Sequence, residues 1–205
     1  VRYAPDILFG YELPKVEVNQ KQLFFSVINC TAKEEGDNNL RTFDDEYTIK
    51  MGKMADWFIE QGWTILFASF CEAEEDEQGA AKIKAQMKHT EDVRIIKYKG
   101  INTNEILTAI VASELIVASR FHATILGFAA GRPVIPVIYS NKTKNVLTDM
   151  EFSGYSFDIR NWGEENVENC LEKILGNVER QYLKDRELFS ERSTEHFEKL
   201  DTIIN

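Results

Sequence analysis

The chain has 205 residues, 43% of them hydrophobic and 28% charged, which is an ordinary balance for a soluble globular protein. A formal net charge of -10 excludes the broad cationic face that binding to DNA or RNA requires, although a local cationic pocket can still bind a small anion. No apolar run approaches the roughly 20 residues of a membrane-spanning helix. The three cysteines form no CxxC pair and indicate reduced thiols, and no signal-peptide pattern opens the chain, so we expect a cytoplasmic protein.

The first residues differ in pattern from the rest of the chain. Pro5–Gly10 predicts the end of a strand and its exit turn, and the polar stretch 13–21, which contains a proline, predicts a linker. We therefore expect residues 1–21 to be the end of an amino-terminal domain that precedes this chain, plus a linker. Residues 22–176 form one domain in this interpretation, and 177–205 form terminal helices that pack on it or on the preceding domain.

From residue 22 onward, short apolar runs alternate with amphipathic segments. The runs predict strands at 23–28, 64–70, 93–98, 115–118, 133–139 and 155–159. Helical periods occur at 44–61, 76–88, 105–113, 122–130 and 144–150, and two charged helices follow. Strands separated by helical crossovers predict an α/β fold, a Rossmann-like parallel sheet with helices on both faces.

Local patterns add finer expectations. Asn102 and Glu105 have the spacing of a capping box at the start of a helix. The acidic run Glu72–Glu77 is interpreted as a solvated loop that enters a helix. Two prolines in 133–139 remove backbone donors, so we expect this strand to be peripheral or only partly paired. The Met and aromatic stripe at 47–58 has the spacing of a core-facing helix side.

One short run combines the residues of an anion site. Ser119-Arg120-Phe121-His122 lies between an apolar run and a small-residue helix, at the carboxyl end of a predicted strand, where ligands bind in parallel sheets. Arg120 offers a rigid fork for a carboxylate or phosphate, and the helix start adds unpaired backbone amides. His122 titrates near neutral pH, and Lys142, after the fifth strand, adds a second positive charge.

Each of these residues also has a structural interpretation. Arg120 could form an ion pair with an acidic neighbour, and His122 could be a helix-start histidine bonded to backbone. Lys144 is available in place of Lys142. Cys30 and Cys71 follow strands, but neither has a base at diagnostic spacing, which favours buried or loop thiols over nucleophiles. No carboxylate or His cluster has metal-ligand spacing, so we expect no metal.

Four segments of the chain form a recognisable set: Ser119-Arg120-Phe121-His122-Ala123, Gly131-Arg132-Pro133-Val134, Tyr139-Ser140-Asn141-Lys142 and Tyr98-Lys99-Gly100. Together they resemble the polysaccharide pyruvyl transferase family. The resemblance spans roughly residues 22–160, and faintly the segment before the linker. It implies a two-domain, glycosyltransferase-B-like architecture of which residues 22–176 are the donor-binding half.

The resemblance implies transfer of a pyruvyl group from phosphoenolpyruvate to a sugar of a surface polysaccharide or its precursor, giving a cyclic ketal and phosphate. His122 and Arg120 would be catalytic, and Ser119, Arg120, His122 and Lys142 would bind substrate. The donor would be phosphoenolpyruvate, with no further cofactor. The acceptor would be a sugar or lipid-linked oligosaccharide, held with the catalytic base largely by the amino-terminal half.

One position departs from the family pattern. Members often carry an Arg just after the first strand of this half, where this chain has Asn29, and Arg41 is the candidate to take its place. Two other functions stay open: a glycosyltransferase-like domain that binds a sugar nucleotide, and a non-catalytic domain that binds an anion. The sequence does not select an oligomeric state.

Overall fold

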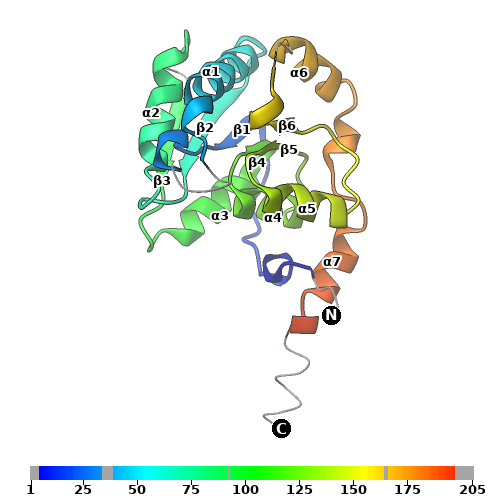
Figure 1. The fold of residues 1–205 in the computed structure, drawn as a ribbon. Helices are drawn as coiled ribbons and strands as arrows, with labels where there is room; N and C mark the ends of the chain where they lie inside the picture. Colours follow the sequence, from blue (N-terminus) through cyan, green and yellow to red (C-terminus); the bar gives the residue numbers. More distant parts are fainter. Residues whose placement is uncertain (1–4, 34–38, 92, 164–165, 197–205) are drawn as a thin grey trace.

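The computed structural model describes residues 5–33, 39–91, 93–163 and 166–196. Within them, six parallel strands form one sheet in the order β3-β2-β1-β4-β5-β6 (Figure 1). This is the order of a doubly wound, Rossmann-like sheet, and it reverses between β1 and β4. The strands are β1 (Asn19–Ser26), β2 (Thr64–Ser69), β3 (Val93–Lys97), β4 (Ser113–Ala118), β5 (Val134–Ile138) and β6 (Phe157–Asp158).

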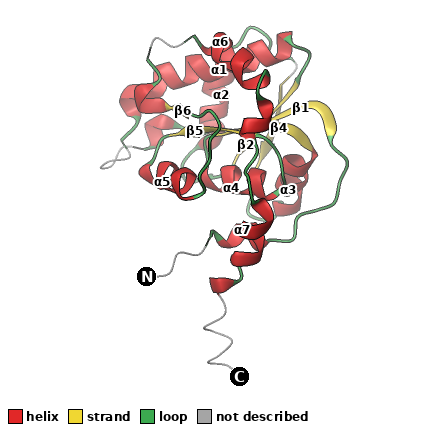
Figure 2. Cartoon of the chain, turned by 90° about the vertical axis from the view of Figure 1, so that its right-hand side faces the viewer, coloured by secondary structure: helices red, strands yellow, loops and turns green. Residues whose placement is uncertain are grey.

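Helices cover both faces of the sheet, so the predicted α/β class is confirmed (Figure 2). On one face lie α1 (Asp44–Glu60), α2 (Asp76–Gln86) and α6 (Val167–Leu175). On the other lie α3 (Thr103–Ala112), α4 (Phe121–Ala129) and α5 (Asn141–Asp149). The face changes because the chain leaves β3 at one edge and returns through α3 to β4, on the far side of β1.

Alternating strand residues fill two hydrophobic cores. Phe25 packs in the core beneath α1 and α2, whereas its neighbour Phe24 packs in the core against α3 and α4. The stripe on α1 is core, as predicted, since Tyr47 and Met51 are fully buried. Continuous apolar strands with both faces covered are what a parallel sheet requires.

The segment before β1 is not a strand end, and that prediction is wrong. Ile7–Gly10 is a 3-10 turn, η1, in which the Asp6 carboxylate accepts a hydrogen bond from the Leu8 amide at 3.0 Å. Its apolar residues serve tertiary packing: the Phe9 ring lies 5.4 Å from the ring of Phe189 on α7 (Arg186–Arg192). η1 and α7 lie together beneath the α3, α4 and α5 layer (Figure 1).

Two further details follow from local hydrogen bonds. Asn102 is the residue before α3, as predicted, but the hydrogen bonds of a capping box do not form. The Asn102 side-chain oxygen accepts from the Lys99 amide at 2.8 Å, and its side-chain amide donates to the Glu105 carboxylate at 2.7 Å. β5 pairs with β4 at 134–136 and with the two-residue β6 only at 137–138. The proline-containing strand is therefore one position from the sheet edge and paired over part of its length on each side.

Candidate functional site

A pocket of about 710 Å³ lies at the strand carboxyl ends, around the turn that carries Arg120 and His122. It lies beside the point where the strand order reverses, and its lining comes from the turn after β4, the start of α5, the loop after β2, α3 and η1. Of the predicted site residues, Arg120, His122 and Lys142 line it together. The position agrees with the general rule for ligand sites in open parallel sheets.

Arg120 is held by two carboxylates from the loop that leads into α2. Its Nε donates to Asp76 Oδ2 at 2.8 Å, its Nη2 donates to Asp76 Oδ1, and its Nη1 donates to Glu74 Oε2. Burial alone would lower the pKa of Arg120, but the two carboxylates raise it overall, so the guanidinium stays charged. The pairing fixes the fork at the pocket wall and uses three of its N–H donors.

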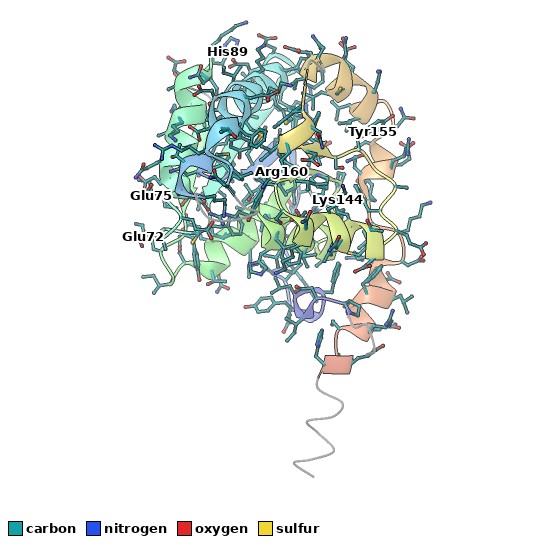
Figure 3. All side chains as sticks on the ribbon, in the orientation of Figure 1. Glu72, Glu75, His89, Lys144, Tyr155 and Arg160 are labelled. Atoms are coloured by element: carbon teal, nitrogen blue, oxygen red, sulfur yellow. The ribbon has the colours of Figure 1, made fainter. Side chains whose placement is uncertain are left out.

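Asp76 corrects the interpretation of the acidic run as a solvated loop. Its side chain is fully buried, and it accepts hydrogen bonds from the Phe70 and Cys71 amides at 3.0 and 2.9 Å. Glu72 and Glu75 do project outward, at the left edge of the molecule in Figure 3. The run is therefore divided, with its outer residues in solvent and Asp76 inside the fold as the partner of Arg120.

Ser119 lies behind the pocket wall. It is fully buried, and its hydroxyl is 2.9 Å from the hydroxyl of Tyr47 on α1. Its amide donates to the Ser26 carbonyl at 2.9 Å, and the Arg120 amide donates to the Ser26 hydroxyl at 3.1 Å. The structure therefore does not bring the Ser119 side chain together with Arg120, His122 and Lys142.

His122 and Lys142 both contact the ring of Phe121. The His122 ring lies 5.5 Å from the Phe121 ring, and Lys142 Nζ lies 3.8 Å from the centre of that same ring. Partial burial lowers the pKa of His122, Lys142 and Arg120 lower it further, and Asp6 opposes them. The lowered pKa favours the neutral imidazole, and an anion bound beside it would favour the charged form again.

The start of α4 adds backbone donors to this group. Arg120 is the residue before the helix, and no side chain caps the first turn. The amides of residues 121–123 therefore have no partner within the helix, as at any helix start. Together with Lys142 and His122, they give this side of the pocket a positive potential although the whole chain is acidic.

Asn29 is fully buried in a polar cluster below the sheet edge. Its side chain accepts from Lys82 Nζ at 3.0 Å and donates to Glu75 at 3.3 Å. Neither Asn29 nor Arg41 is among the residues that line the pocket. Another basic residue of this loop, Lys33, lies beside the pocket wall, with Nζ 4.7 Å from the centre of the Tyr139 ring. The sequence carries no signal for Lys33, because nothing in its neighbourhood distinguishes it from other loop lysines.

The structure also bears on the buried cysteine, on metal binding and on membrane spans. Burial raises the pKa of Cys30 to about 12, so this thiol is not an activated nucleophile. Among the described residues, no group of three His, Cys, Asp or Glu side chains gathers as a metal site would. Likewise, no helix in the described ranges is long and apolar enough to span a membrane.

Comparison with known proteins identifies relatives of this chain. The model of the family described as polysaccharide pyruvyl transferase matches residues 5–141. The amylovoran biosynthesis protein AmsJ of Erwinia amylovora is 20% identical over 148 residues, which are 70% of this chain and 35% of AmsJ. The present chain thus spans about a third of that relative.

A solved structure with some likeness is that of S. aureus TarM in complex with fondaparinux, alpha-GlcNAc-glycerol and UDP. The likeness has a TM-score of 0.47 and 11% identity, over 93% of this chain and 34% of TarM. The family match covers more than half of the present chain and includes the turn that carries Arg120 and His122. This chain belongs to the polysaccharide pyruvyl transferase family.

Proposed function

We propose that this domain binds phosphoenolpyruvate and takes part in transferring its pyruvyl group to a sugar of a surface polysaccharide or its precursor. One observation carries the proposal: the turn that the family match covers opens into the pocket at the switch point, where His122 and Lys142 gather around the start of α4. The coarser role, modification of a polysaccharide, has the support of the family and of AmsJ, whose name refers to amylovoran biosynthesis.

The chemistry needs four events at the donor. A proton is added to the methylene carbon, a sugar hydroxyl attacks the adjacent carbon, phosphate leaves with the C–O bonding pair, and a second hydroxyl closes the ketal ring. Of the two protons that the hydroxyls lose, one balances the new methyl group and the other leaves with phosphate. Groups that hold the anion and supply a proton are therefore the ones to assign.

In this proposal, the donor phosphate lies against Lys142 and the first amides of α4. Its negative charge raises the pKa of His122, which lies beside Lys142, and the charged imidazole then delivers the proton to the methylene carbon. Arg120 keeps the turn in place through Asp76 and presents its remaining N–H groups to the donor. The role of Ser119 is to fix the strand end through Tyr47.

Calorimetric titration with phosphoenolpyruvate, alongside UDP, tests the proposal. The variant Lys142→Met should lower the affinity for phosphoenolpyruvate about tenfold, because it removes one charged contact to phosphate. Lys144→Met is the matched control, since Lys144 is also an exposed lysine of α5 (Figure 3). It should leave the affinity within about twofold of the unmodified chain.

The outcomes separate the alternatives. Preference for UDP would replace the proposal with a sugar-nucleotide domain. Binding of inorganic phosphate without binding of phosphoenolpyruvate or UDP would favour the non-catalytic anion-binding function. Equal losses of affinity in Lys142→Met and Lys144→Met would move the site away from the start of α4.

A further inference from the structure

Two cations converge on one carboxylate oxygen beside the pocket. Glu74 Oε2 accepts from Arg120 Nη1 and from Lys33 Nζ, although the two cations follow different strands, β4 and β1. Glu74 itself lines the pocket, as does Tyr139, whose ring lies under the Lys33 ammonium. We call this place the subsite: it is the position that the Glu74 carboxylate occupies between the side chains of Lys33 and Arg120.

The two sides of this contact differ in how firmly they are held. The side chains of Lys33 and Arg120 are each only 10% exposed, whereas that of Glu74 is 39% exposed. Asp76 fixes Arg120 from behind through two further N–H groups. Glu74 belongs to the turn between β2 and α2 and is the most exposed of the three side chains, so it is the partner that a ligand would displace.

We propose that the Glu74 carboxylate occupies the place of the donor's carboxylate, and that Lys33 is a donor-binding residue exposed when Glu74 is displaced. The inference rests on the proposed function, and it assigns the second anionic group of phosphoenolpyruvate. The first, the phosphate, is assigned above to Lys142 and the start of α4, which line the same pocket as Arg120 and Glu74. Lys33 then supplies the positive charge that Asn29 does not.

Charge favours a carboxylate over a phosphate at this subsite. Burial alone would raise the pKa of Glu74, but Lys33 and Arg120 lower it overall, so a monoanion is already stable between the two cations. A second carboxylate replaces it with no change in the local charge, whereas a dianionic phosphate would add a negative charge next to the buried Asp76. The ligand group at this subsite is therefore a carboxylate, which takes the place of the Glu74 carboxylate.

Binding of phosphoenolpyruvate by calorimetry, with pyruvate and inorganic phosphate as competitors, tests the assignment. Lys33→Met should weaken phosphoenolpyruvate and pyruvate about tenfold and leave inorganic phosphate within about twofold. Lys33→Arg should retain most of the affinity. Glu74→Gln should strengthen pyruvate about threefold or more, because the competing carboxylate is gone. Lys97→Met and Glu77→Gln are the matched controls, since that ion pair is exposed and lies outside the pocket.

The result that overturns the inference is binding of phosphoenolpyruvate that depends on Lys142 but not on Lys33 or Glu74. The proposed function would survive that result. Loss of phosphate affinity together with pyruvate affinity in Lys33→Met would also overturn it, because the subsite would then hold the phosphate. If the unmodified chain binds UDP and not phosphoenolpyruvate, the proposed function fails and the inference fails with it. Thermal melting of each variant distinguishes a loss of binding from a loss of the folded state.

Discussion

Replacing Asp76 by alanine should destabilise the fold far more than the loss of an ordinary surface carboxylate. The Asp76 side chain is fully buried and accepts four hydrogen bonds, two from Arg120 and one each from the amides of Phe70 and Cys71. Asp76→Ala leaves a cation that is 10% exposed without its main partner, and two backbone donors without theirs. All three groups lie at the carboxyl edge of the sheet, where the pocket is formed.

The magnitude follows from the buried charge. Removing one partner of a buried ion pair costs about 3–5 kcal/mol, and the orphaned amides keep the effect in the upper part of that range. For a chain of this size, such a loss lowers the melting temperature by about 6–20 °C. Calorimetric or circular dichroism melting measures the shift, and urea unfolding gives the free energy.

A control variant and a double variant test the cause of this destabilisation. Glu77→Ala removes a neighbouring carboxylate whose side chain is 57% exposed, and it should cost less than about 1 kcal/mol. The double variant Asp76→Ala with Arg120→Met should be more stable than Asp76→Ala alone, because the uncompensated cation is gone. A melting temperature of Asp76→Ala within about 2 °C of that of Glu77→Ala would show that the Arg120–Asp76 contact is not a stabilising buried ion pair.

Three further predictions follow from the same geometry. Affinity for phosphoenolpyruvate should rise as the pH falls from 7.5 towards 5.5, because His122, whose pKa is lowered, becomes charged. In calorimetry, the affinity of His122→Asn should rise less over this pH range than the affinity of the unmodified chain. Ser119→Ala should cost about 1 kcal/mol in urea unfolding, through its lost contact with Tyr47, and leave phosphoenolpyruvate affinity unchanged; a large loss of affinity would contradict its buried position. Gly79→Ala should destabilise the chain by about 1–3 kcal/mol in urea unfolding, since the new methyl group would lie 2.2 Å from the Ile28 carbonyl; an unchanged midpoint would show that α2 moves freely.

The sheet could be predicted from sequence because its strands are continuous apolar runs. Leu115–Ala118 and Ile65–Ala68 are buried and have polar residues at both ends, so length and composition distinguish them from helices. Pro5–Gly10 contains an equally apolar run, but its residues pack against α4 and α7, and a 3-10 turn of that length has no separate signal. An apolar run therefore predicts a strand correctly only where both of its faces are covered by other elements of the fold.

The site was predictable as a location and not as a set of contacts. The strand–turn–helix pattern around Arg120 was sufficient to put that residue and His122 at the pocket. The partners of Arg120 lie 44 and 46 residues earlier, and no spacing rule links them. Of two interpretations of Arg120, an anion-binding fork and an ion pair, the structure shows the second directly. The first remains part of the proposed function.

The decisive experiment is titration of the isotope-labelled chain with phosphoenolpyruvate, followed by proton–nitrogen NMR. We expect the largest shifts in the amides of residues 121–123 and in the turn that carries Glu74, and uptake of a proton by the His122 imidazole on binding. Shifts concentrated in the pocket beside α2 lined by Glu72 and Lys99, with His122 and the start of α4 unchanged, would show that the donor binds elsewhere.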